Sequence, residues 1–240
     1  MTPITPAAPD CQVVELRQYT LHPGQRDTLI DLFDREFVEP QEALGIRVLG
    51  QFRDLDDADR FVWLRGFADM AARGDALPAF YGGPVWAAHR NTANATMVDS
   101  DNVLLLRPAW DGAALPALPP RAERGATAVP PGVLSATVLH LKEPADAALL
   151  DLCRGLASQC LAEAGGRVLG WYATEPAANN FPRLPVREGE HVLLALAMFD
   201  SAEALGAFDF TALEPLLQPW LLRPMQSLRL SPTARSALHA

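Results

Sequence analysis

An eight-residue segment occurs twice in this chain of 240 residues, once in each half. Gly45–Phe52 reads GIRVLGQF and Gly165–Tyr172 reads GGRVLGWY, so five of eight positions are identical at an offset of 120 residues. Before each segment, a helix-like stretch keeps the same offset, with apolar or small residues at positions 29, 32, 33 and 37 and again at 149, 152, 153 and 157. That spacing is typical of the buried stripe of an amphipathic helix. Self-similarity at a fixed offset indicates a repeated structural unit.

Short β-prone runs surround both copies. The predicted strands outside the octapeptides are Val14–Leu21, Phe61–Phe67 and Val103–Arg107 in the first half and Leu134–Leu141, Leu193–Phe199 and Ser227–Ser231 in the second. Each copy therefore reads strand, helix, strand, strand, helical region, strand. Such a βαββαβ unit places four strands in one antiparallel sheet with both helices on one face. The other face must pack on a second sheet or close into a barrel, and two copies in one chain supply both sheets.

These boundaries predict a first unit at residues 10–108, a linker at 109–131 and a diverged second unit at 132–232. The linker region 108–132 holds six prolines in 25 residues, which suits a stiff extended connection. The second copy has a longer loop around Asn179–Gly189, by 12 residues. Aromatic residues flank this loop, either as a lid over a cavity or as a local anchor; they are Trp171, Tyr172 and Phe181.

Three segments of the first copy resemble the NIPSNAP family. Glu15–Gly24 reads ELRQYTLHPG, which follows the family pattern E-L-R-x-Y-x-L-x-P-G. An amphipathic helix and Gly45–Gly50 follow it, and Gly83–Trp86 reads GPVW. The resemblance covers nearly the whole first copy and, more weakly, the second. It implies an α+β fold in which two ferredoxin-like βαββαβ units form a dimeric α+β barrel, here within one chain.

The second copy departs from the opening motif. Positions 15, 17 and 19 are Glu, Arg and Tyr, whereas the equivalent residues are Ser135, Thr137 and Leu139. Any site that depends on the motif should therefore lie in the first half.

Polar residues share one face of two neighbouring strands. Side chains alternate along a strand, so Glu15, Arg17 and Tyr19 point the same way, as do Trp63 and Arg65. If the alternate residues face the helices, these five side chains converge inside the barrel. The second copy has smaller residues at the matching positions, Ser135, Thr137, Ala195 and Ala197, which could leave a cavity. Two interpretations stay open: a ligand pocket of apolar walls and few polar groups, or a buried ion-pair network that joins the halves.

The ligand-pocket interpretation assigns roles to individual side chains. Arg17 or Arg65 would stabilise an enolate or phenolate, and Glu15 or His89 would move a proton; an unperturbed histidine has a pKa of about 6.5. The predicted catalytic residues are Glu15, Arg17 and His89, and the predicted substrate contacts are Tyr19, Trp63, Arg65 and Trp86. By fold-level analogy the reaction would be a cofactor-free monooxygenation or isomerisation of an aromatic or polyketide-like molecule. The alternative is a non-catalytic binding or scaffold protein.

Composition limits the partners. The net charge of −9 and the absence of Lys/Arg clusters argue against nucleic acid, and no run approaches the ~20 apolar residues of a membrane span. Met1–Asp10 has neither the charge nor the apolar run of a signal peptide, and three cysteines suit a reducing compartment, so we expect a cytoplasmic protein. No phosphate-loop, dinucleotide, hydrolase-elbow or zinc motif occurs. We therefore expect no metal and no cofactor, a small-molecule ligand as partner, and a surface compatible with a homo-oligomer.

Overall fold

The computed structural model describes residues 11–208 and 210–240, so Met1–Asp10, on which the N-terminal prediction rests, lies outside the described residues. The elements of the first half are β1 (Val13–Leu21), α1 (Arg26–Leu32), a π-helical turn (Phe33–Phe37), α2 (Val38–Glu42), β2 (Arg47–Asp54), β3 (Arg60–Phe67), α3 (Met70–Tyr81), α4 (Pro84–Asn94), β4 (Met97–Asp99) and β5 (Val103–Pro108). Those of the second half are β6 (Val133–Leu141), α5 (Ala147–Leu152), a π-helical turn (Cys153–Ala157), α6 (Ser158–Glu163), β7 (Arg167–Thr174), β8 (His191–Phe199), α7 (Ala202–Gly206), a 3-10 turn (Phe210–Leu213), α8 (Glu214–Leu217) and β9 (Gln226–Pro232).

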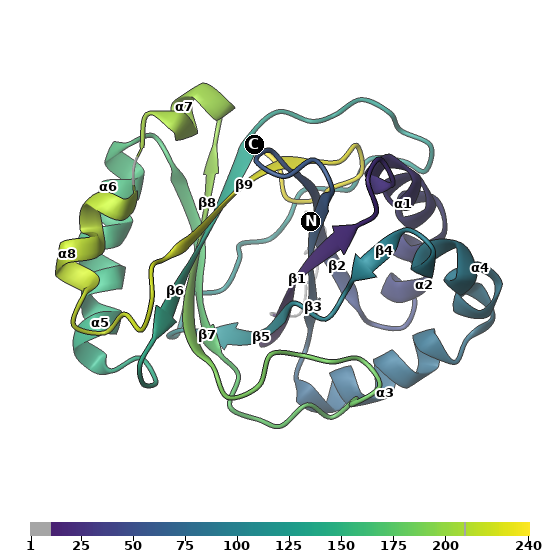
Figure 1. The fold of residues 1–240 in the computed structure, drawn as a ribbon, viewed down its shortest axis with the longest axis horizontal. Coiled ribbons are helices and arrows are strands. Elements are labelled where there is room, and N and C mark those ends of the chain that lie inside the picture. The colour runs from purple at the N-terminus through teal and green to yellow at the C-terminus, as the bar shows by residue number, and fades with distance from the viewer. Residues whose placement is uncertain (1–10, 209) are drawn as a thin grey trace, which may run out of the picture.

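The strands close into an antiparallel barrel (Figure 1). Around it, the first half contributes the order β5-β1-β3-β2 and the second half continues with β9-β6-β8-β7. The halves meet at two seams, where β2 pairs with β9 and β7 pairs with β5. The short strand β4 pairs with the end of β1. This topology confirms the predicted α+β fold class, and closure leaves no unpaired edge between the halves.

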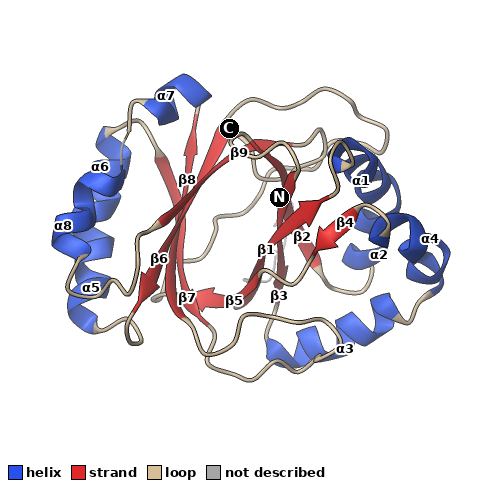
Figure 2. Ribbon diagram, in the orientation of Figure 1, coloured by secondary structure: helices blue, strands red, loops and turns tan. Residues whose placement is uncertain are grey.

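The helices cover the barrel from two opposite sides (Figure 2). Those of the first half, α1 to α4, pack on β1 and β3, and those of the second half pack on β6 and β8. The molecule thus has three buried apolar layers: one under each helical group and one inside the barrel.

The barrel interior is filled with apolar side chains, most of them aliphatic but including Phe52 and Tyr172. An eight-stranded barrel is just wide enough inside for side chains to fill it. The interior residues that the eight strands contribute include Val14, Leu16, Leu49, Val62, Leu64, Leu104, Leu106, Leu134, Ala136, Val138, Leu169, Leu194, Leu196, Leu228 and Leu230.

Local irregularities recur at the offset of 120 residues. Gly45 and Gly165 have φ angles of 82° and 84°, a left-handed conformation that stops each helix at little cost to glycine. A π-helical turn precedes each of them. The strand after each glycine also has an irregular register with its neighbour, between Val48 and Gly50 in β2 and between Val168 and Gly170 in β7. The division into units at 10–108 and 132–232 remains our proposal.

The linker contains no helix or strand, but it is bound to the barrel. Ala109 donates its backbone N–H to Trp171, and Trp171 donates its own to Ala113. Further along, the Arg121 guanidinium donates to the Gln51 side chain and to the Val48 carbonyl. Within the described residues, no helix has the length and apolarity to cross a membrane.

Candidate functional site

The polar residues predicted to line the barrel lie on its outer face instead. Val14 and Val62 point into the barrel, whereas Tyr19 and Trp63 pack in the layer beneath helices α1 to α4. The predicted facing of the two sets was therefore wrong. The helix side supplies the polar partners that buried charges need. Arg73 and Tyr81 of α3 and Gln41 of α2 hydrogen-bond to the charged side chains of β1 and β3.

The small residues expected to leave a cavity inside the barrel also lie outside it. Val133 and Leu139, which share a face of β6 with Ser135 and Thr137, pack in the layer under the second group of helices. The small residues thus lie on the far outer side of the molecule and do not face the polar cluster.

Glu15 is the centre of the cluster on the first half. It is fully buried, and three arginines surround its carboxylate. Arg17 Nη1 lies 2.6 Å and Arg65 Nε 2.7 Å from Oε2, and Arg73 Nε lies 2.7 Å from Oε1. The pairing of β1 with β3 sets Glu15 directly opposite Arg65, while α3 supplies Arg73. We call Glu15, Arg17, Arg65 and Arg73 the arginine cluster.

The cluster carries excess positive charge. Burial alone would raise the pKa of Glu15, but the charges of Arg65, Arg17 and Arg73 outweigh it and hold that pKa well below its usual range. Burial lowers the pKa of Arg73, which the Glu15 carboxylate only partly offsets. Among the described residues, Glu15 is the one carboxylate that hydrogen-bonds to these three arginines. One negative charge therefore faces three positive ones.

Aromatic rings enclose the guanidinium groups. The Arg17 guanidinium lies 5.5 Å from the centre of the Tyr19 ring and 5.6 Å from that of Trp63, and the Arg65 guanidinium lies 5.2 Å from Trp63. At these distances a cation is attracted to the face of a ring. Arg17 also donates from Nε to the Tyr19 hydroxyl at 3.0 Å. Burial raises the pKa of Tyr19, so this hydroxyl keeps its proton at neutral pH.

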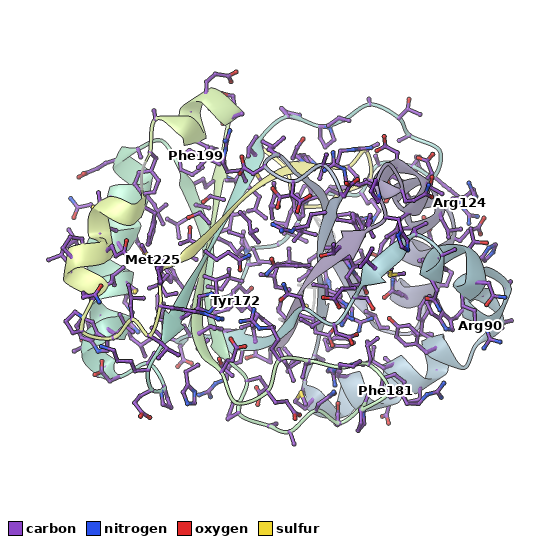
Figure 3. All side chains as sticks on the ribbon, in the orientation of Figure 1. Arg90, Arg124, Tyr172, Phe181, Phe199 and Met225 are labelled. Carbon is purple, nitrogen blue, oxygen red and sulfur yellow. The ribbon has the colours of Figure 1, made fainter. Side chains whose placement is uncertain are left out.

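The long loop of the second half closes over the cluster. The segment 175–190, between β7 and β8, runs beside α3 (Figure 1). Arg73 Nη1 donates to the side-chain oxygens of Asn179 at 3.0 Å and Asn180 at 2.6 Å. Phe181 stacks on Tyr81 with ring centres 5.9 Å apart, and Figure 3 shows Phe181 against the helical side of the first half. Of the three aromatic residues that flank the loop, Phe181 packs on the first half, whereas Trp171 lies under the helices of the second half and Tyr172 lies in the barrel interior. A lid role therefore stays a prediction for Phe181 alone.

We expect the loop to open when its two asparagines are removed. In the double variant Asn179→Ala, Asn180→Ala, Arg73 loses two acceptors, each worth about 1.5–3 kcal/mol to a charged donor. Arg183 in this loop is already exposed, and local opening should free the backbone around it to enter a protease active site. Trypsin should then cleave after Arg183 at least tenfold faster than in the unchanged protein. Asn91→Ala, at an exposed position on α4, is the control and should not change the rate. Equal cleavage of all three proteins would show that the asparagines do not hold the loop.

A pocket of about 230 Å³ opens beside the arginine cluster. Its walls come from β1, α3, α4, β4 with the turn that follows it, and the loop 175–190. They are formed by Tyr19, Tyr81, Trp86, Asn94, Met97, Ser100, Asp101, Phe181, Arg183, Leu184 and Pro185. Tyr19 connects the two features, because its ring lines the pocket and its hydroxyl accepts from buried Arg17. The lining is mixed: four aromatic side chains share it with the polar side chains of Asn94, Ser100, Asp101 and Arg183.

A larger cleft of about 490 Å³ lies at the β5–β7 seam. It is lined by Arg107, by Glu175 and by the outer side of the loop that reaches Glu190. Its charged residues are of both signs, and Arg187 pairs with Glu190. None of the arginine cluster lines it. Each of the two has one residue that accepts a hydrogen bond from a buried arginine, Tyr19 in the smaller pocket and Asn179 in the larger cleft. We favour the smaller pocket as the functional site because its lining includes four aromatic side chains, whereas no Phe, Tyr or Trp lines the larger cleft.

All residues of the arginine cluster fall within the part of the chain that matches a known family. Residues 14–111 match the family model described as NIPSNAP. The first half of this chain carries a NIPSNAP domain. The opening motif of that domain supplies Glu15, Arg17 and Tyr19. Among proteins with curated descriptions, none matches the chain.

Solved structures share the fold of the whole chain. A protein of Fusobacterium nucleatum proposed to be a monooxygenase is 9% identical, with a TM-score of 0.58 and coverage of 93% of both chains. A second such protein, from Lactobacillus acidophilus, is 10% identical, with a TM-score of 0.54 and coverage of 95% of this chain and 98% of its own. An anthrone oxidase-like protein is 15% identical, with a TM-score of 0.54 and coverage of 98% of both. At these identities the shared property is the fold.

The structure separates the predicted site residues of the NIPSNAP domain. It brings Glu15, Arg17 and Arg65 into one cluster, bordered by Tyr19 and Trp63. Trp86 lines the pocket instead, with its ring centre 4.9 Å from that of Tyr81.

His89 is not part of this assembly. It lies on α4, where its Nε2 is 3.7 Å from a Glu36 carboxylate oxygen and its ring meets Phe37 edge-on. It does not line the pocket. Its predicted role as a base therefore has no support from its position.

Several residues of the site escaped the sequence prediction. Arg73 and Tyr81 belong to α3, and Gln41 belongs to α2, where its amide oxygen is 3.4 Å from Arg65 Nη1. Asn179 and Asn180 come from the other half of the chain. One available signal was the basic Arg73 on the apolar side of a helix; the long loop was noticed, but nothing in its sequence revealed where it packs.

Proposed function

We propose that the protein binds a small aromatic molecule in the outer pocket of its NIPSNAP domain. The observation that carries this is the pocket itself: four aromatic side chains line it, and one of them, Tyr19, has a hydroxyl that accepts a hydrogen bond from buried Arg17. Ligand sites are typically apolar with a few polar groups that fix orientation. At about 230 Å³ the pocket is smaller than the ~300–1000 Å³ of drug-sized sites, so a molecule of one or two rings fits best.

The chemistry that this site suits is stabilisation of an oxyanion on the ring. A Tyr19 hydroxyl that accepts from Arg17 can donate its own proton to a phenolate or enolate oxygen. Cofactor-free monooxygenation, with O₂ as oxidant, and isomerisation both proceed through a phenolate or enolate anion. Monooxygenation is favoured by the proteins of the same fold, two of which are proposed monooxygenases and one of which is anthrone oxidase-like.

Glu15 has a different role in this proposal. Both of its carboxylate oxygens accept charged hydrogen bonds, and its pKa is held far below the range of a general base. Its surroundings thus argue against the predicted proton transfer. Glu15 instead holds Arg17, Arg65 and Arg73 in place.

The binding test begins with ligands that accompany the protein. Native mass spectrometry of protein purified from its source, followed by a thermal-shift screen of one- and two-ring aromatics, should find a compound that raises the melting temperature. For such a compound, Trp86→Ala should weaken binding at least tenfold, because Trp86 forms one wall. Trp110→Ala is the matched control: Trp110 is another partly buried tryptophan, but it packs on Trp171 in the second half.

The competing function is a structural lock between sheet and helices. The complete pairing of Glu15 in the arginine cluster favours it. If no aromatic compound co-purifies or shifts the melting temperature, the lock interpretation stands and the binding proposal falls.

A further inference from the structure

The arginine cluster has more positive charge and more hydrogen-bond donors than its own residues use. Arg17, Arg65 and Arg73 are fully buried, yet the Nη2 atom of each has no hydrogen-bond partner among the described residues. The indole Nε1 of Trp63, between Arg17 and Arg65, is in the same state. Buried polar groups are almost always paired, so unpaired donors call for an explanation.

The charge balance points in the same direction. Three guanidinium groups surround one carboxylate, and their other acceptors are neutral: the amides of Gln41, Asn179 and Asn180 and the hydroxyls of Tyr19 and Tyr81. A buried charge without a counter-charge is costly. Of the groups that line the adjacent pocket, the two charged ones, Asp101 and Arg183, are exposed and oppose each other in sign. The buried charge that reaches the pocket wall is therefore that of the arginine cluster, through the hydrogen bond from Arg17 to Tyr19.

Resting on the binding function proposed above, we infer that the ligand is an acidic aromatic molecule that binds as an anion. Its ring lies between the aromatic walls, and its carboxylate or phenolate oxygen accepts the Tyr19 proton. Arg17, bonded to the Tyr19 oxygen at 3.0 Å, transmits the positive charge of the cluster to that point. A neutral ring of the same shape would fill the walls equally well but would leave the charge uncompensated.

Three probes separate charge from shape in the full chain. Isothermal titration should compare 2-naphthoate with 2-naphthamide, which has the same rings without the charge, and with acetate, which has the charge without the rings. We expect 2-naphthoate to bind at least tenfold more tightly than 2-naphthamide, and acetate not to bind measurably. Tenfold corresponds to about 1.4 kcal/mol. Tyr19→Phe keeps the ring but removes the donor, so it should weaken 2-naphthoate about tenfold and leave 2-naphthamide unchanged.

Arg90→Gln provides the charge control. Arg90 is exposed on α4 and does not line the pocket; Figure 3 labels it on the helical side of the first half. Its loss removes one positive charge, as Arg183→Gln does, but should not change either affinity.

The outcomes distinguish the two proposals. Equal affinities for 2-naphthoate and 2-naphthamide, both lost in Trp86→Ala, would overturn the anionic ligand and leave aromatic binding standing. Binding of neither would remove both. Tighter binding of 2-naphthoate that is insensitive to Tyr19→Phe but lost in Arg183→Gln would place the acidic group at the rim, and would overturn the inference as well.

Discussion

Glu15→Gln should destabilise the protein by about 3–5 kcal/mol. The substitution keeps the size of the side chain but leaves three buried arginines without a counter-charge, and its amide N–H₂ faces one of them as a second donor. Breaking a buried ion pair from one side typically costs this much. For a chain of this size, the loss corresponds to a melting temperature about 6–20 °C lower. Urea unfolding followed by circular dichroism would measure it.

The matched control is Ser135→Ala. Ser135 occupies the position 120 residues after Glu15, is also buried on β6, and lies in the apolar layer of the second half. We expect a change within about 1 kcal/mol there. A loss below about 1 kcal/mol for Glu15→Gln would show that the arginines do not depend on this carboxylate.

The acid dependence of stability gives the same prediction a second readout. Because folding depresses the pKa of Glu15, its contribution is complete above the unfolded value of about 4.3 and is lost as pH falls below that value. Glu15→Gln has no such group. The difference in free energy of unfolding between the two proteins should therefore be largest at neutral pH and narrow as pH falls below about 4. A difference that is constant from pH 7 to pH 3 would contradict the assignment.

Leu196→Ala should cost about 2–5 kcal/mol, because Leu196 is fully buried inside the barrel. In a filled interior, the removed atoms leave a cavity that the closed strands cannot collapse. Leu216→Ala, at a leucine that is 50% exposed on α8, should change stability by less than about 0.5 kcal/mol. Differential scanning calorimetry of both variants would compare them. A near-neutral Leu196→Ala would indicate a loosely packed or hollow interior.

The sequence predicted the strands well because their pattern is local. The first strand, predicted at Val14–Leu21, is observed at Val13–Leu21. The hydrophobic pattern could not show which face of the strand points into the barrel, because all residues of β1 except Thr20 are buried. Alternation sorts side chains into two sets without assigning either set to a side. The need of buried charges for polar partners decides the matter, and those partners, Arg73 and Gln41, come from helices whose packing no local pattern shows.

The remaining parts of the candidate site depend on contacts distant in the sequence. Arg73 meets Glu15 across 58 residues, and it meets Asn180 across 107. Such contacts form only when the barrel closes, so a local sequence pattern cannot predict them.

The two seams of the barrel join strands of a single polypeptide, and this has a consequence for stoichiometry. In a barrel made of two identical subunits, symmetry repeats every side chain and every loop, so any pocket occurs twice. Here a substitution appears once. The first half carries the arginine cluster, and the second half, which lacks these charged residues, carries the loop that covers it. A saturating titration should therefore end at one ligand for each 26.0 kDa chain.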